Sequence, residues 1–303
     1  AEIDSLMLPH NHIYYISKPV NNRITICTKG GTTVYDLKTK MFYIQRINNY
    51  TPDYEVRSVE YMECVDSWLI ATSNGLLIYQ EENQSLRHFY SVKDVEETLP
   101  DNNLRCIHKI DDDEVFIGTS DGLCILNVKN KMLRRIDLAT LTNHQSPRLD
   151  VSKIISFNDD EIILSTYTDG LYIYNFKNNT ATHISKFDRR NAISDNYIYD
   201  VFKDENGSIW VATFTGLNRF ENNLANFSTI SVFKNGSMLS INYFLEMNSN
   251  NILVGTESGI KAFNIEDESI VDFRTFFKSK DNYFDSFYVY SFYLDNDSCL
   301  WVG

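Results

Sequence analysis

The stretch IATSNGLLIY, residues 70–79, places a threonine and a short polar turn ahead of a glycine, between two apolar runs. Similar stretches recur along the chain, and their glycines stand at positions 31, 75, 122, 170, 216 and 259. These glycines are 44, 47, 48, 46 and 43 residues apart. A period in the mid-forties, with β-forming residues inside each unit, is typical of a propeller of four-stranded blades. The sequence therefore predicts an all-β fold, a β-propeller.

Each repeat has the chemistry of a β-hairpin flanked by further strands. Glycine adopts positive φ without the steric cost of a Cβ, and Asn74 or Asp121 directly before it is a turn residue. An apolar residue 15 or 16 positions before the threonine marks an earlier strand, and a polar turn separates the two. The strands are rich in Ile, Val, Phe, Tyr and Thr, which suit a pleated, half-buried surface. Each unit is predicted to contain four strands, no stretch shows a sustained helical period, and residues 92–98 are the one segment expected to hold a helical turn in a loop.

The number of repeats sets the expected architecture. One blade cannot bury both of its apolar faces alone, so successive blades are expected to pack around a common axis. The chain is predicted to be a single domain, residues 1–303, with repeats at about 13–47, 56–89, 104–136, 151–184, 198–230 and 241–273 and a partial one at 289–303. We favour seven blades, of which the last is incomplete and pairs with an outer strand formed by the first twelve residues. The chain is then expected to be a piece of a longer protein. A six-bladed ring followed by a tail is the alternative.

The composition disfavours several classes of partner. The net charge of −13 disfavours nucleic acids and anionic membranes, because both require a concentrated basic face. No apolar run of about 18 residues is present, so no membrane segment is expected in this chain. The five cysteines form no CxxC pair and are expected to be small core residues with free thiols. No cofactor is expected.

The residues that could carry chemistry form no recognisable catalytic or metal-binding group. The six histidines are dispersed, and the close pair His10 and His12 lacks a third ligand, so no metal site is predicted. Acidic clusters such as residues 111–113 and 204–206 recur where hairpin turns are expected and lack the spacing of a calcium loop. No Ser–His–Asp grouping is present, so no catalytic residue is predicted. A pair of carboxylates for glycoside cleavage stays open, because any two loops could bring one together.

The predicted ligand-binding positions lie one place after the apolar residue that begins each innermost strand. A core position would repeat as an aliphatic residue, whereas this one varies among aromatic, cationic and polar residues, as expected for a ring that faces a ligand or a water-filled channel. Aromatic faces and planar polar groups suit sugars, because C–H faces stack on rings while hydroxyls bond amides, carboxylates and Arg. The loops at residues 50–54, 101–103, 195–197 and 281–284 are rich in Asn, Asp and Tyr. The candidates are Tyr14, Arg57, Arg105, Tyr199, Asn242 and Tyr290, with Ser152 at the equivalent place of the fourth repeat.

Residues 204–220, DENGSIWVATFTGLNRF, closely resemble the two-component regulator propeller repeat. That repeat is roughly Asp-x-x-Gly-x-(Leu/Ile)-Trp-(Ile/Val)-(Gly/Ala)-Thr-x-x-Gly-Leu-x-Arg-(Phe/Tyr), and residues 194–198 are similar to its upstream Ser-x-Asn-x-Val element. Residues 295–303 match the first half again. The other repeats keep the threonine and glycine but replace the tryptophan, for example with Phe116, Ile163 or Leu253. The resemblance extends over nearly the whole chain.

The resemblance implies a noncatalytic, extracytoplasmic sensor of a hybrid two-component system. In that family two propellers are usually followed by a β-sandwich, a membrane helix, a histidine kinase and a response regulator. The resemblance thus implies a periplasmic module that binds an oligosaccharide released from a glycan and signals to a kinase outside this chain. The implied partners are a second propeller, a β-sandwich and a second copy in a homodimer. A propeller glycosidase or lyase and a protein-interaction scaffold are the alternatives.

Overall fold

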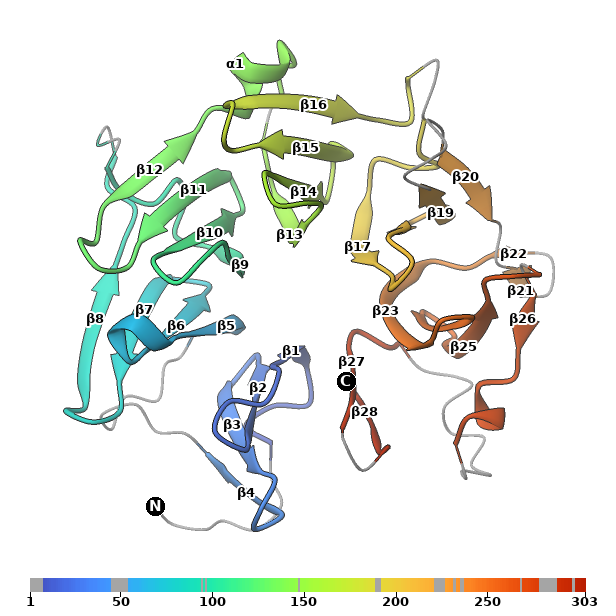
Figure 1. The fold of residues 1–303 in the computed structure, drawn as a ribbon, viewed down its shortest axis with the longest axis horizontal. Helices are drawn as coiled ribbons and strands as arrows, with labels where there is room; N and C mark the ends of the chain where they lie inside the picture. The colour runs from blue at the N-terminus through green and yellow to red at the C-terminus, as the bar shows by residue number, and fades with distance from the viewer. Residues whose placement is uncertain are drawn as a thin grey trace. The chain divides into compact units, whose positions relative to one another are not determined.

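The computed structural model shows an all-β protein built from antiparallel sheets (Figure 1). The structure describes residues 8–44, 54–93, 95, 97–146, 148–188, 192–220, 227–230, 233–234, 237–267, 269–277, 288–295 and 298–303. The chain divides into two compact units. The first comprises Ala1–Asp137 with Pro147–Ile154, and the second comprises Leu138–Ser146 with Ile155–Gly303.

The first unit contains three four-stranded sheets, blades 1 to 3, in which each strand pairs with the next along the chain. Blade 1 consists of β1 (Ile13–Ile16), β2 (Arg23–Thr28), β3 (Gly31–Asp36) and β4 (Met41–Ile44). Blade 2 consists of β5 (Val56–Met62), the 3-10 turn η1 (Glu63–Val65), β6 (Ser67–Thr72), β7 (Gly75–Gln80) and β8 (Ser85–Phe89). Blade 3 consists of β9 (Leu104–Lys109), β10 (Glu114–Thr119), β11 (Gly122–Asn127) and β12 (Leu133–Ile136).

The second unit begins with the short helix α1 (Leu138–Thr142) and contains most of blade 4 and all of blades 5 and 6. Blade 4 consists of β13 (Val151–Ser156), in which the boundary between the units falls, β14 (Glu161–Thr166), β15 (Leu171–Asn175) and β16 (Thr180–Ile184). Blade 5 consists of β17 (Ile198–Lys203), β18 (Ile209–Thr213), β19 (Gly216–Phe220) and β20 (Phe227–Ile230). Blade 6 consists of β23 (Ile241–Asn248), β24 (Asn251–Thr256), β25 (Gly259–Asn264) and β26 (Ile270–Val271). The remaining elements are the pairs β21 (Phe233–Lys234) with β22 (Ser237–Met238) and β27 (Phe292–Leu294) with β28 (Leu300–Val302), and the 3-10 turn η2 (Phe273–Thr275).

The predicted four-stranded blades are confirmed in all six complete repeats. Six complete blades correspond to the six-bladed alternative, and the seventh repeat contributes the two-stranded sheet β27–β28. Residues 1–7, which belong to the proposed closing strand, and the candidate loops at 50–53 and 281–284 lie outside the described residues. So do residues 94 and 96 of the segment expected to hold a helical turn. That the two units form one domain stays a prediction.

A threonine hydroxyl closes each hairpin that the sequence pattern marks. Thr72 Oγ1 donates to the carbonyl of Gly75 at 2.7 Å and accepts the N–H of Asn74 at 3.0 Å. The same two bonds recur at Thr28, Thr119, Thr166, Thr213 and Thr256. The glycine is required at Gly170, where φ is +75° and a Cβ would lie 2.3 Å from the carbonyl oxygen of Ile184. The threonine and the glycine are therefore both part of the turn, with two residues between Thr72 and Gly75 and three between Thr166 and Gly170.

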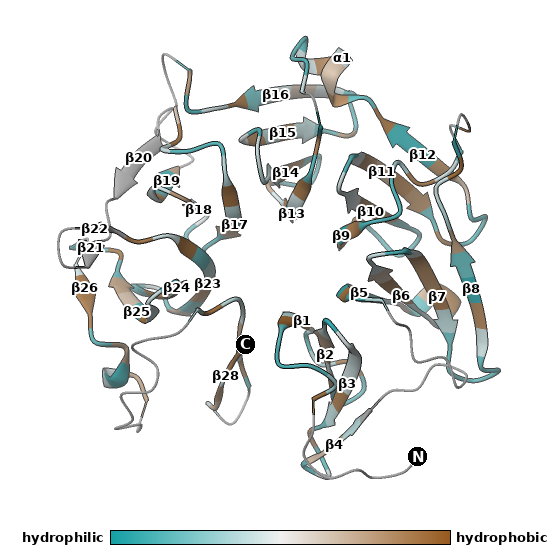
Figure 2. Ribbon diagram, turned by 180° about the vertical axis from the view of Figure 1, so that it is seen from behind, coloured by the Kyte–Doolittle hydropathy of each residue, from teal (hydrophilic) through white to brown (hydrophobic). Residues whose placement is uncertain are grey.

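The core lies between adjacent blades within each unit. In the first unit Leu69 of blade 2 packs with Leu104 and Ile117 of blade 3, and in the second unit Trp210 of blade 5 packs with Phe263 of blade 6. The middle strands β6 and β11 are largely apolar and buried, whereas the fourth strand β16 is partly exposed and more polar (Figure 2). Middle strands such as β6 and β11 are therefore buried, while a fourth strand such as β16 is partly exposed.

A glycine before the threonine allows two blades to approach closely. A Cβ on Gly118 would lie 2.6 Å from Cγ1 of Val151, which begins the next first strand. A Cβ on Gly255 would lie 2.8 Å from Cγ1 of Val289, ahead of β27. The small residue at this place of the repeat thus sets the separation between one blade and the next first strand.

All five cysteines are free thiols, but not all belong to the core. Cys27 and Cys124 are buried, whereas Cys64 and Cys299 are exposed, so the prediction of core residues is wrong for these two. Both stand in turns beside strands instead of within them. In the part of the chain that the structure describes, no helix has the length and apolar character needed to cross a membrane.

Candidate functional site

Five of the six candidate residues occupy the same structural position, the extra residue of a β-bulge in the first strand of a blade. In blade 2, Val56 pairs with Thr72 and Ser58 pairs with Ala71, which leaves Arg57 without a counterpart on β6. The same shift of register occurs at Tyr14, Arg105, Tyr199 and Asn242. A bulge redirects the extra side chain away from the regular alternation of the strand, and bulges are common next to functional sites. The sixth candidate, Tyr290, lies just before β27.

Next to each bulge, a backbone hydrogen bond joins the residue before the first strand to the residue after the hairpin threonine. The N–H of Ser73, directly after Thr72, donates to the carbonyl of Glu55 at 2.9 Å, and that of Phe214 donates to Tyr197 at 3.0 Å. Equivalent bonds join Lys29 to His12, Ser120 to Asn103 and Glu257 to Ser240. The residues on both sides of the buried apolar residue are therefore held at the hairpin end of the blade.

In the first unit, Tyr14, Glu55 and Arg57 form a connected polar group. Arg57 Nη2 lies 2.5 Å from Glu55 Oε2, and its guanidinium carbon lies 4.9 Å from the centre of the Tyr14 ring. Burial, followed by a hydrogen bond to Glu55, raises the pKa of Tyr14 to about 12. Burial would raise the pKa of Glu55 as well, but hydrogen bonds from Tyr14 and Arg57 outweigh it and lower this pKa. Glu55 is therefore a carboxylate held between a hydroxyl and a guanidinium.

Arg105 forms a bidentate ion pair with Asp150. The distances are 2.8 Å from Nε to Oδ1 and 2.9 Å from Nη2 to Oδ2, and the side chains are 16% and 14% exposed. Such a pair fixes the plane of the guanidinium group as well as its position. The pairs Tyr14–Glu55 and Arg105–Asp150 are equivalent. In each pair the bulge residue of one blade contacts the residue directly before the first strand of the following blade.

In the second unit, Tyr199 and Tyr290 belong to a group of tyrosines. The Tyr199 ring lies 5.0 Å from that of Tyr197, which lies 5.5 Å from that of Tyr167. Tyr290 stacks on Tyr288 with ring centres 6.0 Å apart. Burial, followed by the charges of Tyr288 and Tyr199, raises the pKa of Tyr290. Tyr197, Tyr288 and Tyr290 are 39%, 56% and 45% exposed, so their rings are accessible to a ligand.

Asn242 differs from the other candidates because its amide bonds within the fold. Its Nδ2 donates to the carbonyl of Val289 at 3.2 Å, and its Oδ1 accepts the hydroxyl of Ser240 at 3.4 Å. The residue is only 8% exposed. Asn242 thus holds the segment before β27 against blade 6, while a role in ligand binding stays a prediction.

The sequence interpretation did not single out the partners of the candidates, apart from Tyr197 in the noted loop 195–197. Glu55, Asp150, Tyr197 and Tyr288 each stand one place before the apolar residue that marks a first strand. This place varies as much in chemistry as the place after the apolar residue, so the same criterion applied there would have found them. The structure brings Tyr14 together with Arg57 and close enough to Arg105 for its charge to act on the tyrosine. In the second unit the charge of Tyr199 contributes to the raised pKa of Tyr290.

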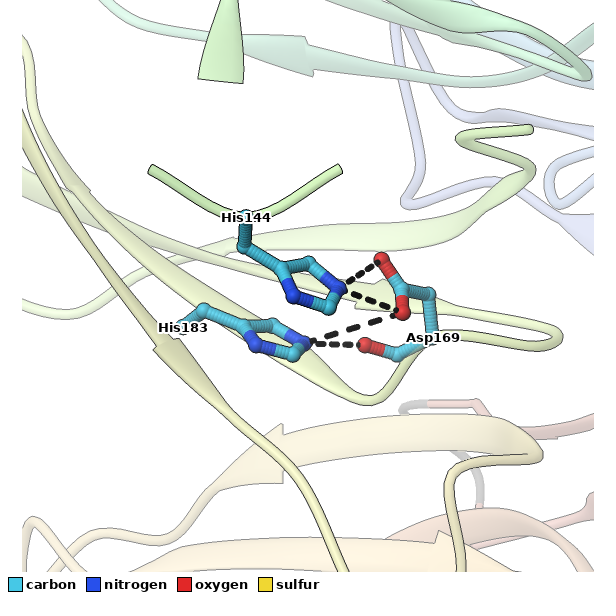
Figure 3. Close-up of side chains that lie close together, drawn as sticks. All are labelled: His144, Asp169 and His183. Carbon is cyan, nitrogen blue, oxygen red and sulfur yellow. Dashed lines mark hydrogen bonds and ion pairs between the residues drawn. The ribbon is translucent and has the colours of Figure 1, made fainter. Parts of the chain in front are cut away.

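A second polar group in the second unit, the histidine–aspartate cluster, consists of His144, Asp169 and His183 (Figure 3). His144 Nε2 lies 3.0 and 3.2 Å from the two carboxylate oxygens of Asp169. His183 Nε2 lies 2.6 Å from the carbonyl oxygen of Asp169 and 3.9 Å from its Oδ1. The two imidazole rings stack, with centres 3.9 Å apart and planes 16° apart. One ligand atom from each residue lies within 4.8 Å of the others, so these residues could hold a metal ion.

Comparison with known families identifies one of the repeats. Residues 192–215 match the model of the family described as Two component regulator propeller. This match confirms the resemblance seen in residues 204–220. A search of curated proteins found no match to the chain.

Solved structures of similar fold come from several sources. The extracellular domain of the hybrid two component system BT3049 from B. thetaiotaomicron has a TM-score of 0.75 at 19% identity, over 98% of this chain and 39% of that one. YCF48 from Cyanidioschyzon merolae has a TM-score of 0.70 at 10% identity, over 99% and 95% of the two chains. PorZ, a bacterial surface component of the type-IX secretion system of Porphyromonas gingivalis, has a TM-score of 0.69 at 12% identity, over 96% and 45%. At these identities the likeness establishes the fold alone, and this chain spans well under half of the BT3049 domain.

Proposed function

Because the chain carries a two-component regulator propeller repeat, we propose that it is a noncatalytic sensor module of a hybrid two-component system that binds a glycan-derived oligosaccharide. In this proposal the module lies in the periplasm, as the extracytoplasmic part of a membrane-anchored protein whose kinase lies outside this chain. A second propeller and a β-sandwich of the same protein are its proposed partners, as is a second copy in a homodimer. The extracellular origin of the BT3049 domain, which shares the fold, supports this placement.

The repeated bulge is the observation that carries the proposed ligand class. In the first unit it presents Tyr14, Arg57 and Arg105 beside two carboxylates, and in the second it presents Tyr199 among other tyrosines. Guanidinium groups donate to sugar oxygens, carboxylates accept from hydroxyls, and tyrosine rings stack on C–H faces. Binding would signal by favouring one of two states of the sensor through its differential affinity for them.

A panel of glycan fragments separates this function from its alternatives. Purified protein is titrated with each fragment by calorimetry, and the mixtures are then analysed for cleavage. We expect saturable binding of at least one fragment and no products. Products would instead establish a glycosidase or lyase, and the absence of binding by folded protein across the panel would contradict ligand binding by this chain.

Substitutions at the bulges test where the ligand binds. Arg105→Ala should weaken binding of an identified fragment about tenfold or more, because a hydrogen bond to a charged group contributes about 1.5–3 kcal/mol and 1.4 kcal/mol corresponds to a factor of ten. Tyr199→Ala should weaken it about two- to tenfold, because a stacked aromatic ring contributes about 0.5–1.5 kcal/mol. Arg134→Ala is the control, since Arg134 lies exposed on β12 and outside the bulges. Affinities measured by calorimetry that stay unchanged in both variants would show that the bulge residues do not form the site.

A further inference from the structure

Blades 2 and 4 provide an internal comparison for the histidine–aspartate cluster. His88 on β8 and His183 on β16 occupy equivalent places in the register of the third and fourth strands of their blades. Each histidine bonds through Nε2 to the carbonyl of the residue before the hairpin glycine, Asn74 at 2.7 Å and Asp169 at 2.6 Å. This bond belongs to the closure of the hairpin, because it is present in blade 2 without a carboxylate or a second histidine.

Blade 4 departs from blade 2 in three ways, and the departures converge on one point. Asp169 provides a carboxylate where blade 2 has the amide of Asn74. Tyr172 takes the place of Leu77, and its hydroxyl donates to Asp169 Oδ2 at 2.5 Å. His144 reaches the same carboxylate from the segment that follows α1. None of these three groups is needed for the hairpin, so together they indicate a local site.

The end of α1 fixes the position of His144. The N–H of Asn143, whose φ is 52°, donates to the carbonyl of Thr140 at 3.4 Å, and the N–H of His144 donates to that of Ala139 at 3.2 Å. These two bonds form a Schellman motif with Asn143 in the left-handed conformation. The helix also packs against β16, which carries His183. The two imidazoles consequently lie one above the other with both Nε2 atoms directed at Asp169 (Figure 3).

We propose that the histidine–aspartate cluster binds a divalent first-row transition metal ion, with zinc the best suited, through Nε2 of His144, Nε2 of His183 and the carboxylate of Asp169. Imidazole nitrogens with one carboxylate are typical zinc ligands, whereas calcium and magnesium prefer oxygen atoms alone. Zinc bonds of about 2.0–2.1 Å place tetrahedral ligand atoms roughly 3.3 Å apart. The separations from Asp169 Oδ1 are 3.0 Å to His144 Nε2 and 3.9 Å to His183 Nε2, so the carboxylate lies near the required distance from both histidines. The stacked imidazoles, whose planes are 16° apart, have to turn away from each other so that each Nε2 lone pair points at the ion.

The surroundings of Asp169 suit a cation. Burial would raise the pKa of this carboxyl, but hydrogen bonds from Tyr172, His144 and Ser146 outweigh it and hold the pKa below its usual range. When the ion binds, the Tyr172 hydroxyl remains bonded to the Asp169 carboxylate and orients it toward the metal. His144 is 36% exposed, which leaves room for a water molecule as the fourth ligand. On binding, the proton of each Nε2 is exchanged through solvent to Nδ1 of the same ring, and His183 exchanges its bond to the Asp169 carbonyl for the metal. Acid weakens binding because protons compete with the ion for the imidazole nitrogens.

Calorimetric titration of the full chain with zinc tests the site, with the intense visible absorption of tetrahedral cobalt(II) as a second readout. We expect one saturable site that is lost in Asp169→Asn and in His144→Gln. Asp169→Asn installs the amide that blade 2 carries at Asn74, so the hairpin is kept, and circular dichroism checks the fold. His88→Gln is the matched control, because it removes the equivalent histidine of blade 2. The titrations are made in a His10→Gln, His12→Gln background, which removes the other close histidine pair.

Tyr172→Phe gives a graded result, because the loss of an outer partner of a metal ligand weakens affinity by about 10- to 100-fold. Binding should also weaken in mildly acidic buffer. Zinc binding that persists in Asp169→Asn and His144→Gln, or that disappears in His88→Gln, would overturn the assignment. So would the absence of binding to the folded protein. This inference does not depend on the proposed sensor function.

Discussion

His108 on β9 links the stability of the first unit to pH at the scale of a single residue. Burial, followed by the charges of Lys153 and Lys18, lowers the pKa of His108 from 6.5 to about 4. Between these two values the unfolded chain is protonated at this residue while the folded chain is not. The unfolded state therefore binds more protons, and stability decreases as the pH falls through this window.

The free energy of unfolding measured by urea at several pH values checks this effect. The wild type should lose up to about 3 kcal/mol through His108 between pH 6.5 and 4, since one pKa unit corresponds to about 1.4 kcal/mol. His108→Gln should flatten the curve in this window, and His10→Gln, at an exposed place, should leave the curve unchanged. Equal slopes for the wild type and His108→Gln would contradict the assigned pKa.

At the scale of the element, the separation between neighbouring blades depends on one small residue per repeat. A Cβ on Gly118 would meet Val151 Cγ1 at 2.6 Å and Cys106 Sγ at 2.8 Å. Gly118→Ala should therefore lower the free energy of unfolding by about 1–3 kcal/mol through overpacking. Denaturant unfolding of a double-mutant cycle with Val151→Ala provides the control, because the second substitution makes room for the added methyl group. The double variant should be less destabilised than the sum of the single variants, and simple additivity would show that the two residues do not compete for space.

The aspartate and the tryptophan of the family repeat also stabilise a blade at this scale. Asp204 accepts the N–H of Ser208 at 2.8 Å through Oδ1 and the indole N–H of Trp210 at 2.9 Å through Oδ2. Asp295 bonds Cys299 and Trp301 in the same way. The carboxylate thus orders its own turn and ties it to the following strand. The prediction that the acidic cluster at residues 204–206 is a hairpin turn is confirmed.

At the scale of the whole molecule, the seventh repeat is a packed part of the second unit. Phe292 on β27 is 3% exposed and belongs to a core with Leu253 and Ile260 of blade 6. Phe292→Ala should lower the free energy of unfolding of the second unit by about 3–5 kcal/mol, the usual cost of removing a buried aromatic ring. Ile270→Ala on β26 is the control, because Ile270 is 48% exposed. Denaturation curves in which both variants unfold like the wild type would indicate a tail that does not pack.

The candidate binding residues are distributed over the molecule at one position per blade. No single blade holds both Arg105 and Asp150, or both Tyr14 and Glu55, so each pair exists only when adjacent blades pack. The proposed ligand binding at these positions would therefore be coupled to the packing of blades within each unit. This coupling would allow a bound sugar to favour one arrangement of neighbouring blades.

The amino-acid sequence by itself determined the blades and their hairpins, and it marked the positions of Tyr14, Arg57, Arg105, Tyr199 and Asn242. That these positions are β-bulges is seen only in the structure. The sequence could determine the blades and hairpins because the bonds from threonine to glycine act within a few residues and the hairpin recurs every 43 to 48 residues along the chain. Only the tertiary structure decided which side chains meet. Arg105 and Asp150 are 45 residues apart, and His144 and Asp169 are 25 apart, so their contacts depend on how separate segments come to pack. No local sequence pattern encodes these contacts, because they arise when apolar strands are buried between blades.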